Sequence, residues 1–301
     1  MPSDYRGRFA PSPSGPLHLG SLLTALASFL DARAHGGQWL LRIDDLDPYR
    51  TQPDATTRIL HSLEQLGLHW DGPIVLQSQQ LERYRLGLES LQSQGLIYAC
   101  TCSRRQLAAD DATGIYPGNC RDQHHRFQDG QQALRLRTDD RSILFDDQVQ
   151  GRQQQILSQA VGDFVLYRRD GAFAYHLATV LDDAEQRVTH IVRGCDLLDS
   201  TPRQIYLQSL LTLPLPVYAH TPILVDGRGQ KLSKRLMAPE AETRQPGAIL
   251  AHLLDLLRHP LPCELTGASV TEILSWATSI WDLRRLRHVG SLVVNPRQFA
   301  T

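Results

Sequence analysis

The chain has 301 residues, 42% hydrophobic and 21% charged, which is enough for about two domains with a large core and no disulfide support. Its formal net charge of −1 excludes a globally basic nucleic-acid-binding protein, although a local basic patch would still bind RNA. The longest apolar run, residues 22–30, is too short to span a bilayer and the N-terminus lacks a secretory segment, so we expect a cytoplasmic protein that binds no membrane.

The first third of the chain alternates predicted strands and helices, which is typical of a parallel α/β sheet. Ser21 is the expected N-cap of the first helix, and Gly67 and Gly95 occupy the C-cap positions of the next two. The elements expected here are strands at 5–12 and 39–43 and helices at 21–34, 53–66 and 79–94.

The pattern changes at Tyr98, after which the chain becomes rich in cysteine, arginine and aspartate. Short alternating strands at 133–138 and 142–147 indicate an α+β insertion over 98–170. Strand–helix alternation then resumes, and the end of the chain, from residue 236, is expected to be mainly helical. The later elements expected are helices at 175–182 and 201–211 and strands at 189–194 and 222–226.

A glycine- and proline-rich turn, PSGPLHLGS at 13–21, joins the first strand to the first helix. A helix N-terminus offers free N–H groups and the positive end of the helix dipole, so it favours a phosphate. Gly20 would let a nucleotide approach closely, and His18 would donate to one of its oxygens. Taken alone, such a turn is more often structural than functional.

The only two lysines of the chain, Lys231 and Lys234, lie in one short loop, KLSKR, whereas every other basic residue is arginine. An ammonium group and a guanidinium group are not interchangeable, so this placement suggests a specific need for lysine. Three cations on a glycine-flanked loop suit a mobile clamp for a polyphosphate and its departing pyrophosphate. The alternative is an ordinary solvated basic loop.

Three of the five cysteines, Cys100, Cys102 and Cys120, are spaced as in structural tetrahedral zinc sites. Three unconnected buried cysteines are the alternative. Cys195 and Cys263 are expected to be ordinary core residues. Ligand chemistry favours a histidine as the fourth zinc ligand, which the sequence leaves open among Tyr116, Asp122, His124 and His125.

HLGS and KLSKR together resemble the HIGH and KMSKS motifs of class I aminoacyl-tRNA synthetases. The tracts RFAPSPSGPLHLGS, LLRIDDLDP, GLHWDG, YHLATVLDD and VTHIVRGCDLLDSTPRQ resemble, in family order, the glutamyl- and glutaminyl-tRNA synthetase branch. The resemblance implies an α/β fold with a Rossmann-like parallel sheet, an inserted zinc-containing α+β subdomain and a short helical C-terminal region. Residues 1–97 and 171–235 would be the two halves of the catalytic domain. Residues 98–170 would be the zinc-binding, tRNA-contacting insertion, and 236–301 are too few for an anticodon-binding domain.

The resemblance also implies roles for individual residues. His18, Lys231 and Lys234 would be catalytic, with Lys234 stabilising the leaving pyrophosphate. The ATP-binding residues would be His18, Gly20, Ser21, Lys231, Ser233 and Lys234. The glutamate-binding residues would be Arg8, Ala10, Ser12, Asp44, Tyr175 and Arg193.

Three positions depart from the family pattern. Ser21 stands in place of the second histidine of the motif, Asp44 is one methylene shorter than the usual glutamate, and Thr179 replaces a common asparagine. The aspartate keeps the negative charge that would bind the α-ammonium group of the substrate. We therefore expect the reaction to be retained and the details of the pocket to differ.

Both the truncation and the pattern C-x-C followed by Y-x-x-x-C resemble the glutamyl-queuosine tRNA(Asp) synthetases. This resemblance implies a structural zinc on Cys100, Cys102, Tyr116 and Cys120. It also implies tRNA-independent activation of glutamate with ATP and Mg²⁺, followed by transfer to queuosine in tRNA(Asp), by a monomer. The alternatives are a minimal glutamyl-tRNA synthetase that charges the tRNA 3′ end, or a catalytically silent zinc/RNA-binding paralogue.

Arginines in the insertion are candidates for contacts with the phosphates of an anticodon stem-loop. The alternative is that some of them only neutralise nearby carboxylates. The four candidates are Arg104, Arg105, Arg121 and Arg126.

Overall fold

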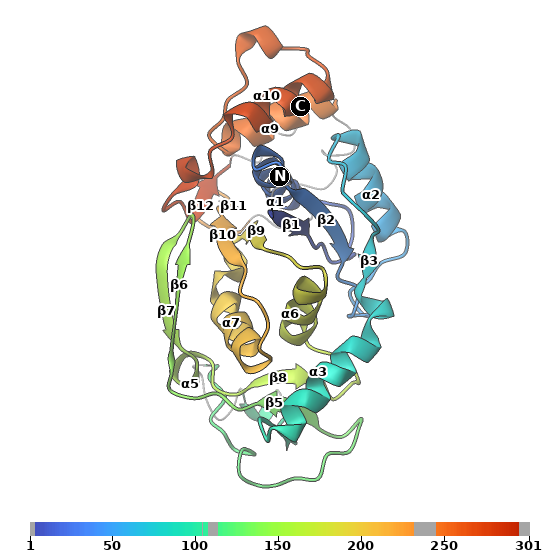
Figure 1. Ribbon diagram of the computed structural model, residues 1–301, viewed down its shortest axis with the longest axis vertical. Helices are drawn as coiled ribbons and strands as arrows, with labels where there is room; N and C mark the ends of the chain where they lie inside the picture. Colours follow the sequence, from blue (N-terminus) through green and yellow to red (C-terminus); the bar gives the residue numbers. More distant parts are fainter. Residues whose placement is uncertain (1–3, 104, 108–113, 232–244, 295–301) are drawn as a thin grey trace.

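The computed structural model describes residues 4–103, 105–107, 114–231 and 245–294. At its centre, β1 (Arg6–Phe9), β2 (Gln38–Ile43) and β3 (Val75–Leu76) pair in parallel (Figure 1). β9 (His190–Gly194) pairs in parallel with β10 (Val217–Thr221) and lies beside β1. The expected parallel α/β sheet is therefore confirmed.

α1 (Leu19–Ala34) is buried because elements cover it on two sides. It packs against β1 and β9 on one side and against α9 (Pro246–Leu256) and α10 (Val270–Ile280) on the other. A helix that is apolar around most of its circumference requires such cover. The predicted N-cap was wrong: the cap is His18, whose Nδ1 accepts from the Ser21 N–H at 3.2 Å.

The other predicted helices lie close to their expected positions. Gly67 and Gly95 follow α2 and α3 with φ of 66° and 70°, the left-handed conformation of a C-cap glycine. The helices are α2 (Ala55–Gln65), α3 (Leu81–Ser93), α6 (Tyr175–Glu185) and α7 (Thr201–Leu210), with 3₁₀ turns at η1 (Gln77–Gln79), η2 (Cys195–Ser200), η3 (Cys263–Leu265) and η4 (Leu283–Leu286).

An antiparallel region lies at the lower end of the molecule in Figure 1. It contains a three-stranded sheet, a hairpin that runs from there up to the parallel sheet, and a short helix. The sheet is β4 (Ile97–Cys100), β5 (Ala133–Leu136) and β8 (Phe164–Tyr167); the hairpin is β6 (Ser142–Asp147) and β7 (Gly151–Ile156); the helix is α5 (Leu157–Ala160).

The C-terminal region contains one strand that the sequence did not predict. β12 (Ser291–Val293) pairs in parallel with β11 (Ile223–Val225), while α9 and α10 account for the expected helical character. Cys263 is exposed and Cys195 is partly exposed, so their assignment to the core was wrong. Within the described residues, no helix has the length and apolar character needed to cross a membrane.

Candidate active site

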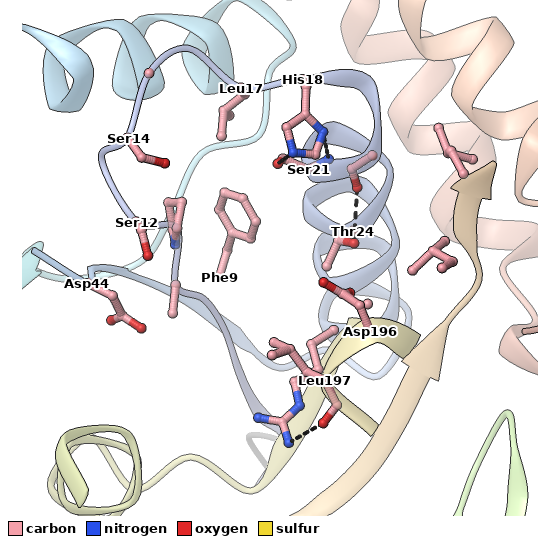
Figure 2. A pocket seen from close by; sticks show the side chains of 18 of the residues that line it. Phe9, Ser12, Ser14, Leu17, His18, Ser21, Thr24, Asp44, Asp196 and Leu197 are labelled. Atoms are coloured by element: carbon pink, nitrogen blue, oxygen red, sulfur yellow. Dashed lines mark hydrogen bonds between the residues drawn. The ribbon is translucent and has the colours of Figure 1, made fainter. Parts of the chain in front are cut away.

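A pocket of about 330 Å³ opens where β1, β2 and β9 end, beside the N-terminus of α1 (Figure 2). In open parallel sheets, ligands bind at the carboxyl ends of the strands. Ser233 and Lys234 lie outside the described residues. All the other predicted ATP- and glutamate-site residues line this pocket: Arg8, Ala10, Ser12, His18, Gly20, Ser21, Asp44, Tyr175, Arg193 and Lys231.

His18 and Ser21 form the side of the pocket at the N-terminus of α1, away from Ser12 and Asp44 (Figure 2). Because Nδ1 of His18 accepts from the Ser21 backbone, the neutral ring carries its proton on Nε2, which lies 3.1 Å from Ser21 Oγ. A Cβ at position 20 would come within 3.3 Å of the His18 ring. Gly20 therefore lets the imidazole lie over the helix end.

A buried ion network supports one wall of the pocket. Arg8 Nε donates to Asp183 Oδ1 at 3.2 Å, and Arg42 Nη1 donates to the same oxygen at 2.6 Å. Arg42 Nε also donates to Asp44 Oδ1 at 2.8 Å. Asp182 lies 3.8 Å from Arg42 Nε, and Arg42 is fully buried. These bonds fix Arg8 and Asp44 relative to each other across two strands.

The network gives its carboxylates different pKa values. Burial raises the pKa of Asp44 to about 6, although Arg42 and Arg8 oppose the shift. Burial acts in the same direction on Asp183, but Arg8 and Arg42 outweigh it and hold that pKa below its usual range. Burial lowers the pKa of Arg42, yet the surrounding carboxylates raise it well above its usual value. Asp183 is therefore a permanent charge, whereas Asp44 titrates near pH 6.

Arg193, at the end of β9, is buried and held by hydrogen bonds on several sides. Its Nε donates to His220 Nε2 at 3.0 Å, and its Nη2 donates to Thr201 Oγ1 at 2.8 Å. Its Nη1 lies 3.5 Å from the Tyr175 hydroxyl. The guanidinium group is thus fixed in the pocket before any substrate binds.

Lys231 lies at the pocket edge, where its Nζ is 2.6 Å from Asp196 Oδ2. Both side chains are about half exposed, so the pair contributes little to stability. A polyphosphate could therefore replace Asp196 as the partner of this lysine at small cost.

Several residues of this site were not predicted from the sequence. Arg42, Asp182 and Asp183 lie within the quoted tracts LLRIDDLDP and YHLATVLDD, but no role was predicted for them. The signal in the sequence that could have indicated them is the placement of charged residues next to the ends of a predicted strand and a predicted helix. His220 carried no comparable signal.

A second candidate site lies in the antiparallel region. The Sγ atoms of Cys100, Cys102 and Cys120 lie within 4.8 Å of one another. The Tyr116 hydroxyl is 3.5 Å from Cys100 Sγ and 3.9 Å from Cys102 Sγ. Metal–sulfur bonds of about 2.3 Å in a tetrahedron place ligand atoms roughly 3.5–3.8 Å apart, so the three thiol groups could hold one metal ion, and the Tyr116 hydroxyl lies close to two of them. Arg135 closes the site, because its Nε donates to Cys100 Sγ at 3.2 Å.

The other candidates for a fourth ligand do not join this cluster. His124, His125 and Asp122 are exposed, and in the described part of the chain the metal-ligand group contains no histidine or carboxylate. Hydrogen bonds from Thr101 overcome the effect of burial and lower the pKa of Cys120 to about 6. This shift favours the thiolate form of Cys120, which is the form that binds a metal.

The candidate RNA-contacting arginines differ in their surroundings. Arg121 Nη1 donates to Asp163 Oδ1 at 2.8 Å, so it neutralises a local carboxylate. Arg105 and Arg126 are exposed. Arg104 lies outside the described residues.

The fold and the pocket define an α/β protein with a candidate ligand site at the carboxyl ends of its parallel strands, and comparisons with known proteins give its family. Residues 4–245 match the family described as tRNA synthetases class I (E and Q), catalytic domain. The chain is 52% identical over 286 residues to the glutamyl-Q tRNA(Asp) synthetase of Ectopseudomonas mendocina, covering 95% of this chain and 96% of that protein. It is also 52% identical over 282 residues to the glutamyl-Q tRNA(Asp) synthetase of Methylococcus capsulatus, covering 94% and 93%. The chain therefore belongs to the class I tRNA synthetases (E and Q), which are ligase-class enzymes, and within them to the glutamyl-Q tRNA(Asp) synthetases.

Solved structures of larger relatives have the same fold. The glutamate-tRNA synthetase of Elizabethkingia anophelis has a TM-score of 0.81 at 25% identity, over 98% of this chain and 69% of that one. The glutamate tRNA ligase of Elizabethkingia meningosepticum, solved in complex with its amino acid, has a TM-score of 0.80 at 24% identity, over 98% and 68%. The class I synthetase fold is thus established for this chain.

Proposed function

We propose that the chain, a cytoplasmic monomer, activates glutamate with ATP without tRNA and then transfers it to queuosine at the wobble position of tRNA(Asp). The observation that carries the activation step is one pocket that combines Arg8, Arg193 and Asp44 with the N-terminus of α1. The transfer step is supported by the names of relatives that are 52% identical over nearly the whole chain.

In this proposal, Arg8 and Arg193 bind the two carboxylates of glutamate. Asp183 holds only Nε of Arg8 in the described part of the chain, so the Nη pair is available for a bidentate contact. Asp44 binds the α-ammonium group, and its ionised form is required for that contact. Ala10, Ser12 and Tyr175 complete the amino-acid pocket.

ATP would bind with its phosphates at the N-terminus of α1, near His18, Gly20 and Ser21, and with Mg²⁺ as its counter-ion. The glutamate carboxylate attacks the α-phosphorus, the bond to pyrophosphate breaks, and glutamyl-adenylate remains bound. No protein nucleophile takes part, so catalysis consists of alignment and charge stabilisation. The pyrophosphate leaves toward the cationic loop, whose proposed ligands are Lys231, Ser233 and Lys234.

We assign the catalytic domain to residues 1–97 and 171–235, a zinc-binding, tRNA-contacting insertion to 98–170, and a helical region to 236–301. Zn²⁺ is the proposed metal, and its ligands would be Cys100, Cys102, Tyr116 and Cys120. The spacing of these four donor atoms supports the assignment. Burial raises the pKa of Tyr116, so the metal would have to displace the phenol proton.

The insertion would contact the anticodon stem-loop through exposed arginines. Arg105 and Arg126 are the candidates that the structure leaves exposed, whereas Arg121 is paired with Asp163. A contact with phosphate positions the RNA but does not read its sequence. Recognition of queuosine itself would need other groups.

The test is glutamate-dependent exchange of pyrophosphate into ATP, with and without tRNA, followed by transfer of labelled glutamate to tRNA(Asp) with and without queuosine. We expect exchange without tRNA and transfer only to queuosine-containing tRNA(Asp), with no ester on the 3′ end. Exchange that requires tRNA would instead identify a minimal glutamyl-tRNA synthetase. If neither assay gives a signal with the zinc-loaded protein, the chain is not a glutamate-activating enzyme.

A further inference from the structure

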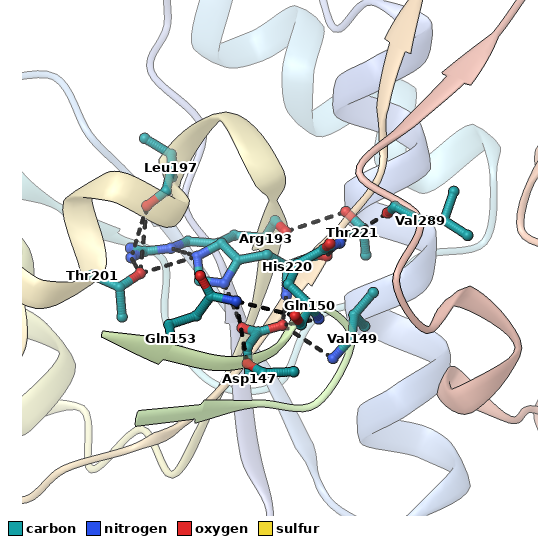
Figure 3. A network of polar contacts seen from close by, with 11 residues as sticks. Asp147, Val149, Gln150, Gln153, Arg193, Leu197, Thr201, His220, Thr221 and Val289 are labelled. Atoms are coloured by element: carbon teal, nitrogen blue, oxygen red, sulfur yellow. Dashed lines mark hydrogen bonds and ion pairs between the residues drawn. The ribbon is translucent and has the colours of Figure 1, made fainter. Parts of the chain in front are cut away.

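The tip of the β6–β7 hairpin reaches the wall of the active site. Asp147, the last residue of β6, is buried, and its Oδ2 lies 2.6 Å from His220 Nδ1 on β10 (Figure 3). The opposite ring nitrogen, Nε2, accepts from Arg193 Nε at 3.0 Å. One chain of hydrogen bonds therefore joins the antiparallel region to an arginine that lines the pocket.

The chemistry of the donors decides where the proton of His220 lies. Arg193 Nε is always a donor, so Nε2 of His220 must be the acceptor and cannot carry a proton. The proton must therefore be on Nδ1, which requires an acceptor at Asp147. The carboxylate of Asp147 can only accept: burial raises its pKa, but hydrogen bonds from the His220 ring and from the backbone N–H groups of Gln150 and His220 outweigh that effect and lower it. Burial also keeps His220 neutral by lowering its pKa.

The second oxygen of Asp147 is already occupied. Its Oδ1 accepts from the backbone N–H groups of Val149, Gln150 and His220 at 3.0, 2.7 and 3.1 Å. These three groups are obligatory donors. Consequently, Oδ2 is the atom left for the imidazole, and the carboxylate is held in one orientation.

The hairpin tip is also anchored on both sides. The Gln150 amide donates to the carbonyls of His220 and Val289, each at 2.8 Å, and the His288 N–H donates to Val149 O at 2.7 Å. The tip thus lies between β10 and the segment that leads into β12, as Figure 3 shows. This anchoring makes the position of Asp147 independent of any substrate.

We propose that Asp147 is a positioning residue for glutamate binding: it fixes the tautomer of His220 so that His220 aims the guanidinium group of Arg193 at a carboxylate of glutamate. Asp147 and His220 do not touch the substrate. The proposal rests on the glutamate-binding role proposed above for Arg193.

Asp147→Asn is the sharpest test, because it keeps the size and the hairpin turn. The single side-chain oxygen of the asparagine accepts the hydrogen bonds of the three backbone donors, so its NH₂ group faces His220 Nδ1. The imidazole must then carry its proton on Nε2, where it faces the Nε–H of Arg193 and can donate only by turning toward Thr201 Oγ1, 3.1 Å away, which already accepts from Arg193 Nη2. We expect KM for glutamate to rise on the order of tenfold to a hundredfold, as for a buried donor left without its partner, with KM for ATP nearly unchanged.

The matched control is Asp146→Asn, which makes the same change in charge at the neighbouring exposed position of β6. It should leave both KM values unchanged. His220→Phe keeps a ring but removes both nitrogens, so it should reproduce the increase in KM for glutamate. Adding Asp147→Asn to it should then raise KM no further, because the effect passes through the imidazole.

Nitrogen-15 NMR of the His220 ring provides a readout that does not depend on activity. We expect a proton on Nδ1 in the unaltered protein and on Nε2 in the Asp147→Asn variant, with thermal melting showing that both are folded. An unchanged tautomer, or an unchanged KM for glutamate in an active variant, would overturn the proposal. If the unaltered protein shows no exchange at all, the proposed function fails, and the tautomer measurement still decides the role of Asp147.

Discussion

Replacing Asp44 with asparagine should stabilise the protein at neutral pH while it weakens glutamate binding. Asp44 is buried and its pKa is raised to about 6 from 3.8. A carboxyl group whose pKa is higher in the folded state than in the unfolded state destabilises the fold when it ionises. This loss of folding stability is absent below pH 3.8, develops between pH 3.8 and 6, and is complete above pH 6. The shift corresponds to about 3 kcal/mol, which is the upper limit of the gain expected in Asp44→Asn at pH 7.5.

The assay is urea unfolding of both proteins at pH 7.5 and pH 4, combined with pyrophosphate exchange from pH 5 to 8. The gain in stability should be much smaller at pH 4, because the carboxyl group is then protonated in the folded wild type and only just past the midpoint of its titration in the unfolded chain. In the wild type, kcat/KM for glutamate should fall about tenfold per pH unit below pH 6, as the free enzyme takes up one proton. The variant should show a KM for glutamate that is raised roughly tenfold to a hundredfold and lacks this inflection.

One result would refute this reasoning. If Asp44→Asn is less stable than the wild type at pH 7.5 and binds glutamate equally well, the carboxylate of Asp44 is neither destabilising nor a ligand. Asp44→Glu, which keeps the negative charge and adds one methylene, serves as the control for charge.

Four further substitutions test the buried ion network, the metal site, the cationic loop and the insertion. Arg42→Met leaves buried carboxylates unpaired and should cost about 3–5 kcal/mol in the free energy of unfolding, with a smaller loss at pH 4. Tyr116→Phe should keep the ring beneath Arg135 yet release zinc at a chelator concentration roughly tenfold lower, measured by a colorimetric metal indicator. Lys234→Ala should slow pyrophosphate exchange about 10²–10³-fold, the cost of losing one donor to a developing charge, with the melting temperature unchanged. Replacing Arg105 and Arg126 together by alanine should lower the slope of log affinity for tRNA against log salt by about 2, measured by filter binding, and an unchanged slope would remove both from the interface.

Local patterns in the sequence predicted β1, β2 and β9 of the parallel sheet, whereas the residues that line the pocket were predicted from the resemblance to the tRNA synthetases. Arg8, Asp44 and Arg193 stand at or just after strands, and the ends of parallel strands meet at one edge. The cap of α1 was misassigned because serine is a common N-cap and histidine is not. β12 has three residues, too few for a periodic signal.

The supporting charges could not be predicted in the same way. Arg42 and Asp183 are 141 positions apart, and His220 and Asp147 are 73 positions apart. No local periodicity encodes such pairs, because they form only when the tertiary fold brings distant segments together. The residues that line the pocket were therefore predicted better than the residues that hold them in place.

The packing of α9 and α10 on α1 determines how far the chain can be shortened. Leu250, Leu253 and Leu254 of α9 are fully buried in the same core as α1, and Trp281 Nε1 donates to Asp31 Oδ1 at 2.9 Å near the end of that helix. A chain cut before residue 246 would expose the apolar outer side of the helix whose N-terminus lies at the pocket. Such a fragment would tend to aggregate rather than act as a smaller catalyst. Any effort to reduce this enzyme to a minimal active unit therefore has to retain the two C-terminal helices, even though they lie outside the pocket.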